Sequence, residues 1–262
     1  MNQQNAPAID ADQTQLRHRS EGQVLPLQRA DRPRAISRRY EISYLTEEGY
    51  AADVSRVAPA TPQFEEAFSA FAHGTLFQTD RGMLAIEDIY PGLKVETEAG
   101  LQTVLWVGSM SVLPWSEDGP KDPCKLMRIT AGSWGFDRPS QDLLLGSGAR
   151  LLYRHAGCQE LLGTDAGFAP ARAFIDDESM LSVRPASSVR LFHLGFYGQQ
   201  ILRANGLEVE SYHPGQQAEM LMNTETKARF LSLFPHIRSM EDFGPQPEPR
   251  LTRFEVENLR LS

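Results

Sequence analysis

The segment AFAHGTLFQTDRGMLAIEDIYPGLKVETEAG, residues 70–100, decides the fold class of this chain. Short apolar runs alternate in it with turn signals. TLFQT ends at Asp80-Arg81-Gly82, where the glycine can close a turn with a positive φ, and Pro91-Gly92 marks the next turn. The segment therefore predicts short strands joined by tight turns.

The same pattern continues beyond this segment. Val189, Leu191 and His193 fall on one face of a period-two pattern, as expected for a half-buried strand. Many short strands without a strand–helix rhythm predict a compact all-β body. The further strand candidates are LQTVLWVGSM (101–110), KLMRITAG (125–132), QDLLLGSGARLLYR (141–154), SSVRLFHLGF (187–196) and QQILRANGL (199–207).

The two ends of the chain differ from this β-rich middle. Residues 1–38 contain few apolar residues, so we predict a disordered N-terminal arm, followed by a strand at 40–45. Residues 225–234 have helical spacing, with Asn223 or Thr224 as N-cap and Pro235 as the stop, and predict one short C-terminal helix. The last residues, 251–262, are expected to form a strand or to remain loose.

The composition is that of an ordinary globular protein, with 41% hydrophobic and 23% charged residues in 262. A formal net charge of −8 argues against nucleic acid as a partner, because neutralising phosphates requires an excess of Lys and Arg. No apolar run approaches the roughly 18 residues of a membrane span. The first residues lack the apolar core of a secretory signal, so the sequence gives no localisation.

Metal and cofactor sites are not indicated. Cys124 and Cys158 do not make a disulfide framework, and His155-x-x-Cys158 supplies two ligands where a structural zinc site needs four. The acidic groups Glu87-Asp88 and Asp176-Asp177-Glu178 are interpreted as solvated faces or turn caps. We therefore predict no cofactor and no metal.

Three ordered blocks resemble the Hint (hedgehog/intein) domains, in particular the bacterial stand-alone subgroup. The first is AFAHGTLFQTDRGMLAIEDIYPGLKVETEAGLQTVLWVG (70–108), similar to a block that opens on Cys-Phe-x-x-Gly-Thr. The others are QDLLLGSGARLL (141–152), similar to a block that contains Ser-Pro-Gln-His, and LFHLGFYGQQILRANGLEVESYHPG (191–215). The resemblance implies a pseudo-two-fold β horseshoe and, in active members, self-cleavage. There the cysteine attacks the preceding carbonyl, aided by the block histidine.

The resemblance places non-reactive residues at each catalytic position of this chain. Ala70 stands at the cysteine position, Ala149 at the block histidine and Gln199 at the second histidine, with Tyr197 at an aspartate position. The residues that match the family's scaffold are Gly74, Thr75, Gly82, Gly92, Trp106, Gly108, Ala204, Asn205 and Gly206. The resemblance thus implies a scaffold without its reactive groups.

Ser69 is the alternative nucleophile, by an N-to-O acyl shift at the Phe68–Ser69 bond. A hydroxyl needs a positioned base, and Ser69 is one residue out of register, so we interpret it as an ordinary loop residue. We expect His73 to be an exposed loop histidine, and His193 and His213 to be structural residues bonded to backbone carbonyls.

The leading hypothesis is a degenerate Hint domain that acts as a structural or peptide-binding module, with a peptide of its own (near Phe64–Phe71) or of another chain as partner. The alternative is autoprocessing through Ser69, which would release about residues 1–68. The predicted organisation is an arm at 1–38, a short segment and linker at 39–67, the Hint-like domain at 68–215, and a helix and tail at 216–262.

Overall fold

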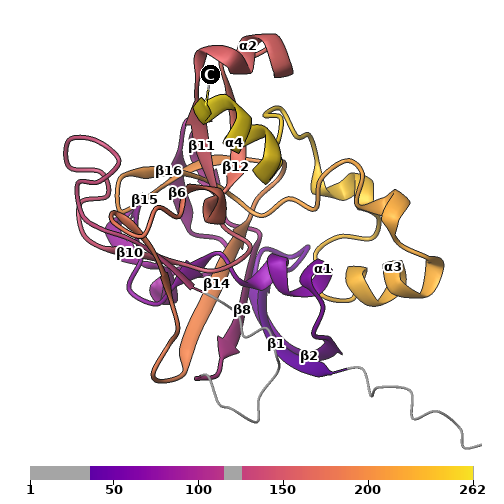
Figure 1. The fold of residues 1–262 in the computed structure, drawn as a ribbon. Helices are drawn as coiled ribbons and strands as arrows, with labels where there is room; N and C mark the ends of the chain where they lie inside the picture. Colours follow the sequence, from indigo (N-terminus) through magenta and orange to yellow (C-terminus); the bar gives the residue numbers. More distant parts are fainter. Residues whose placement is uncertain (1–35, 115–125, 262) are drawn as a thin grey trace, which may run out of the picture. The chain divides into compact units, whose positions relative to one another are not determined.

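The structure is a computed structural model, and it describes residues 36–114 and 126–261 (Figure 1). The described part is built of strands arranged in two sheets, and its longest helix has 9 residues. The prediction of an all-β body is therefore confirmed. The predicted arm lies outside the described residues up to position 35, and the first strand already begins at Ser37.

The first sheet has eight strands, and the pairings between them are antiparallel. The predicted strand at 40–45 lies within β1, between β8 and the edge strand β2. In spatial order the strands are β13 (Met180–Val183), β9 (Leu126–Ile129), β10 (Leu143–Leu145), β3 (Phe71–Ala72), β14 (Val189–Gly195), β8 (Trp106–Val112), β1 (Ser37–Leu45) and β2 (Ala51–Pro59).

The second sheet is also antiparallel and contains the remaining strands. In spatial order they are β12 (Ala166–Pro170), β11 (Arg150–Arg154), β16 (Leu207–Glu210), β15 (Ile201–Ala204), β6 (Lys94–Thr97), β4 (Leu76–Thr79) and β5 (Gly82–Ala85), with β7 (Gly100–Thr103) paired to β6 off this path.

Short helices connect or cover the strands. The α-helices are α1 (Pro62–Glu65), α2 (Ala156–Leu162), α3 (Thr224–Leu231) and α4 (Arg253–Leu261). The 3-10 helices are η1 (Glu66–Phe68), η2 (Ile86–Asp88), η3 (Ala171–Phe174), η4 (Glu219–Leu221) and η5 (Met240–Phe243). No helix in the described ranges is long and apolar enough to cross a membrane.

Two turns show why particular scaffold residues stand where they do. Gly82 has a φ of 95° and closes the β4–β5 hairpin opposite Thr79. Asn205 and Gly206 have φ values of 47° and 84°, which match the two-residue hairpin turn that Asn-Gly favours. The side chain of Asn205 also accepts a hydrogen bond from the backbone N–H of Leu76, at 2.8 Å, and so joins the β15–β16 turn to β4.

The hydrophobic core has two main clusters. The first draws side chains from both sheets, such as Phe71 of β3, Val95 of β6 and Leu202 of β15. The second is centred on Trp106 of β8, which is fully buried and donates a hydrogen bond from Nε1 to the carbonyl of Leu233 at 2.9 Å. This second cluster ties the residues before β3 and the residues after α3 to the same sheet.

Residues 61–68, which precede the candidate site, contribute Phe64, Ala67 and Phe68 to this second cluster. Phe64 and Phe68 are buried, and Phe68 lies edge-on to Trp106 with ring centroids 5.2 Å apart. Phe64 contacts Phe230 of α3 in the same way, at 6.0 Å (Figure 1 shows α1 beside α3). The chain thus enters β3 from a packed segment.

The C-terminal region contains the predicted helix, which ends at Leu231 and so stops before the predicted end at Phe234, and one helix that was not predicted. Helix α3 begins after Asn223, whose side chain accepts from the N–H of Thr226 at 2.8 Å. The expectation of a strand or loose tail at 251–262 is wrong, because residues 253–261 form α4. Thr252 and Glu255 hydrogen-bond each other's backbone N–H groups at its start, in the pattern of a capping box.

Candidate functional site

The candidate site lies where the chain passes from η1 into β3. Ala70 is fully buried there and held on both sides by backbone hydrogen bonds. Its N–H donates to the carbonyl of Phe192 in β14 at 3.1 Å, and its own carbonyl accepts from the N–H of Gly146 at 2.9 Å. The methyl group of Ala70 is part of the first core cluster and offers no reactive atom.

Ser69, the alternative nucleophile, is also completely buried. Its Oγ lies 3.2 Å from the Oγ of Ser147, and the N–H of Gly148 donates to it at 3.2 Å. The same N–H donates to the backbone carbonyl of Ser69 at 3.0 Å. No histidine or carboxylate of the described residues hydrogen-bonds the Ser69 hydroxyl, so no base is in position to remove its proton.

The turn at 146–149 is pressed against this segment. A Cβ atom on Gly146 would lie 2.2 Å from the carbonyl oxygen of Ser69, and one on Gly148 would lie 2.3 Å from that of Glu66. Ala149 follows, buried, and its carbonyl accepts from Ala171 at 3.0 Å. The fold therefore brings the segment of Ala70 and the turn of Ala149 together, as two backbones in contact.

Gln199 has different neighbours. Its buried side chain donates to the carboxylate of Glu210 and accepts from the N–H of Glu248 at 2.8 Å. Its backbone N–H donates to Pro245 at 2.9 Å. Gln199 thus fastens the extended segment 245–250 to the second sheet.

His193 and His213 are both buried next to this region. The Nδ1 of His193 lies 3.2 Å from the carbonyl oxygen of Glu66, while its Nε2 has no hydrogen-bond partner among the described residues. Burial lowers the pKa of His193 to about 3, against the opposing effects of the backbone of Glu66 and, next, of Glu210. His193 is therefore neutral at physiological pH, with Nδ1 as the protonated nitrogen because a carbonyl oxygen only accepts.

His213 is held by backbone groups at both ring nitrogens. Nε2 donates to the carbonyl of Gly244 at 3.2 Å, and Nδ1 accepts from the N–H of Gly215 at 3.1 Å. Burial lowers its pKa to about 4.

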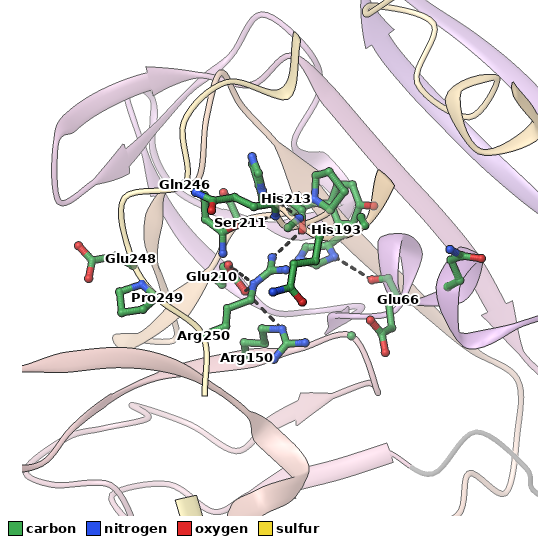
Figure 2. Close-up of a pocket in the computed structure, with 18 of the residues that line it drawn as sticks. Glu66, Arg150, His193, Glu210, Ser211, His213, Gln246, Glu248, Pro249 and Arg250 are labelled. Atoms are coloured by element: carbon green, nitrogen blue, oxygen red, sulfur yellow. Dashed lines mark hydrogen bonds and ion pairs between the residues drawn. The ribbon is translucent and has the colours of Figure 1, made fainter. Parts of the chain in front are cut away.

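A pocket of about 780 Å³ opens beside His193 and His213 (Figure 2). Its charged lining is an ion-pair cluster of Glu210 with two arginines. The Nε of Arg250 lies 2.9 Å from one oxygen of Glu210, and the Nε of Arg150 lies 3.5 Å from the other. The Glu210 side chain is only 3% exposed, so this cluster is largely shielded from water.

Sequence reasoning missed this cluster. Arg150, Glu210 and Arg250 come from three distant parts of the chain. The one available signal was the placement of Arg150 inside the strand candidate 141–154, because charged residues in strands are seldom buried without a partner.

The other residues singled out in the sequence are structural. His73 is exposed, as expected, and pairs with Glu87 at 3.0 Å. His155 is the N-cap of α2 and accepts from the N–H of Gly157 at 3.1 Å, whereas Cys158 is buried in the core. Asp176 caps a turn by accepting from the N–H groups of residues 178–180. Cys124 lies outside the described residues, and within them no group of acidic, histidine or cysteine side chains is arranged to hold a metal.

Comparison with known proteins gives the family. The family model described as the Hint domain matches residues 69–216, which is more than half of the chain. The chain belongs to the Hint domain family. The match begins at Ser69, directly before Ala70, and it includes the turn at 146–149 and the hairpin that carries Gln199 and Glu210.

Two solved structures are similar to this Hint chain. The crystal structure of gp41-1 intein is 18% identical, covers 55% of this chain and 98% of its own, and has a TM-score of 0.34. The solution structure of the bacterial intein-like domain from Clostridium thermocellum is 16% identical, covers 55% and 99%, and has a TM-score of 0.38. A search of curated proteins found no match. The assignment to the Hint family rests on the family model.

Proposed function

We propose that this chain is a Hint domain that no longer cleaves itself and serves as a binding module for peptides. The observation that carries the proposal is the surroundings of Ser69. Its hydroxyl contacts only another hydroxyl and a backbone N–H among the described residues, and the next residue is Ala70. Self-cleavage by acyl shift needs a nucleophile, a base to activate it and an acid to protonate the departing amine.

The positions of the family's histidines support the same proposal. Ala149 carries no titratable group, and the Gln199 amide is occupied by Glu210 and Glu248. His193 is the nearest candidate for an acid because its Nδ1 contacts the carbonyl of Glu66. A pKa of about 3 makes it neutral at pH 7, so it holds no surplus proton to give.

The residues before Ser69 also favour a role other than release of a fragment. Strand β1 pairs with β8, and Tyr40, Ile42 and Phe68 are buried in the second core cluster. A fragment ending at Phe68 would therefore stay attached to the domain after the bond was broken. The pocket beside Glu66 offers the place for a peptide, because Glu66, Arg150 and Arg250 line it together.

The second candidate function is autoprocessing through Ser69. One contact favours it: the N–H of Gly148 donates to both the Oγ and the carbonyl of Ser69. In that reaction the Ser69 oxygen bonds to the Phe68 carbonyl carbon, the C–N bond breaks, and the proton moves to the new amine. Hydroxylamine would then cleave the ester to a hydroxamate at Phe68 and restore the free hydroxyl of Ser69.

The test is the intact mass of the full-length chain under denaturing conditions, fresh and after a day at neutral pH, with and without hydroxylamine. We expect a single full-length mass in every sample. Denaturing conditions matter because a nicked chain would remain associated through β1. A fragment beginning at Ser69, present in the natural chain and absent from Ser69→Ala, would overturn the proposal in favour of autoprocessing.

A further inference from the structure

The pocket beside the candidate site combines charged and apolar lining. The charged lining holds Arg150, Arg250 and Glu210, and the apolar lining includes Leu221, Met222 and Phe230. A volume of about 780 Å³ lies within the range of sites that take small organic ligands or a few residues of a peptide. The pocket is therefore large enough for a ligand that has both a charged and an apolar part.

The charges in this cluster do not balance. One carboxylate, Glu210, contacts both guanidinium groups, and its remaining bond is to the neutral amide of Gln199. Two positive charges thus face one negative charge where water is largely excluded, since the side chains of Arg150 and Arg250 are only 24% and 20% exposed. An anion bound here would neutralise the remaining charge.

The other two acidic residues of the pocket contribute less to this balance than Glu210 does. Glu66 forms no ion pair with a described residue, although its charge acts on Arg150 from a distance. Glu248 points away from the arginines (Figure 2). Burial, followed by the charge of Arg250, lowers the pKa of Arg150, while the charges of Glu210 and Glu66 oppose this effect.

Arg150 is the guanidinium that is available to a ligand. Arg250 uses Nε for Glu210 and Nη2 for the carbonyl of His213, at 2.6 Å. Arg150 approaches Glu210 most closely through Nε, and its two terminal nitrogens have no hydrogen-bond partner among the described residues. A guanidinium with two free terminal nitrogens presents the planar fork that binds a carboxylate through two parallel hydrogen bonds.

We propose that this pocket binds a carboxylate attached to an apolar group, with Arg150 as the anchor. A singly charged anion fits this pocket better than a phosphate dianion, because Glu210 and Glu66 repel a dianion more strongly. The apolar lining accommodates the group that carries the carboxylate. This inference rests on the proposed peptide-binding function, because that function supplies the ligand. The ligand is the free C-terminus of a peptide that ends in an apolar residue.

The test is calorimetric titration of the full-length protein with three probes: N-acetyl-Ala-Ala-Leu with a free carboxylate, the same peptide as its C-terminal amide, and 4-methylpentanoate. We expect the free acid to bind at least tenfold more tightly than the amide. A peptide acid that binds more tightly than 4-methylpentanoate identifies a peptide C-terminus as the ligand, and equal affinities identify a small organic acid. Either result supports the carboxylate site.

The variant Arg150→Gln should lose at least tenfold in affinity for the free acid. The matched control is Arg203→Gln, an exposed arginine on β15 that pairs with Glu96. Thermal unfolding of both variants checks that they fold, and the acid–amide comparison in the natural chain needs no variant. Equal binding of acid and amide, or no binding of any probe at millimolar concentration, would overturn the inference. Equal binding would leave the proposed peptide-binding function standing.

Discussion

Gly146 shows how closely two backbones approach at the candidate site. The turn at 146–149 contacts the segment before β3 so tightly that the position of a Cβ atom is already occupied by the Ser69 carbonyl oxygen. A reactive site needs room for an attacking group and a departing amine. The structure uses this space for backbone packing, with Gly146 donating to Ala70 and Gly148 to Ser69.

The variant Gly146→Ala tests this close approach. Its methyl group would lie 2.2 Å from the Ser69 oxygen and 2.7 Å from Cδ1 of Leu191, so a backbone must shift. Overpacking of this kind costs roughly 1–3 kcal/mol in the free energy of unfolding, and contact with backbone places it at the upper end. Urea unfolding measures the loss. The control is Gly49→Ala, where no atom lies within 4 Å and only the positive φ adds about 1–2 kcal/mol. Equal losses in the two variants would contradict the packing.

The buried histidines predict a loss of stability in mild acid. Burial lowers the pKa of His193 to about 3 and those of His213 and His236 to about 4. The unfolded chain binds protons on these residues near pH 6.5, while the folded chain does not. Their stabilisation is therefore complete above pH 6.5 and falls as the pH is lowered. His193 alone should cost about 2 kcal/mol between pH 7 and pH 5.

Urea unfolding at pH 7, 6 and 5 measures this dependence. In the variant His193→Gln, the free energy of unfolding should fall less steeply with pH, because the unfolded state takes up about one proton fewer. His73→Gln serves as the control because its ring is exposed. These pH values keep the readout above the range in which most carboxylates titrate. An unchanged slope in His193→Gln would mean that His193 accepts a proton in the folded state.

At the scale of elements, local signals were sufficient for the β4–β5 hairpin, whose turn Gly82 closes, and for the start of helix α3. The Asn205-Gly206 turn was missed, because both residues were placed inside one strand candidate at 199–207 although Asn-Gly favours a hairpin turn. Helix α4 was missed because it opens with the period-two run Phe254-Glu255-Val256-Glu257, which is typical of a strand, and because its stability comes from burying Val256 and Leu259 in the first core cluster. The ion-pair cluster of the pocket was missed for a related reason: its members meet only in the folded chain.

Helix α3 depends on its N-cap. Asn223 accepts from the N–H of Thr226 at 2.8 Å, and the helix carries Phe230 into the second core cluster. Asn223→Ala should lower the free energy of unfolding by about 1 kcal/mol, whereas Asn223→Asp should retain most of the stability. Thermal unfolding of the two variants side by side measures the difference. Equal destabilisation by Ala and Asp would show that the cap is not the cause.

At the scale of the whole molecule, the hydrophobic core extends over more of the chain than the family match does. The match covers residues 69–216, yet the second core cluster also contains Tyr40, Ile42 and Phe64 before it and Phe230 and Phe234 after it. The motif blocks could not reveal that these flanking residues join the core. Such blocks contain only the positions that related chains share, and not the segments that pack against those positions. The pocket beside the candidate site is likewise lined in part by residues outside the family match, such as Glu66, Phe230 and Arg250.

The final prediction concerns this dependence on the flanking segment. A chain shortened to begin at Ile36 keeps every described residue and should unfold cooperatively at nearly the same temperature as the full chain. A chain that begins at Ser69 loses β1 and the buried side chains of Tyr40, Ile42, Phe64 and Phe68. Each large apolar side chain contributes about 1.5–3 kcal/mol, so together they approach the 5–15 kcal/mol that typically separates folded from unfolded domains.

We expect this shorter chain to lack a cooperative transition in circular dichroism and to regain it when residues 36–68 are added as a separate peptide. A cooperative transition without the peptide would show that the family-matched body folds alone, and that β1 is an attachment to it.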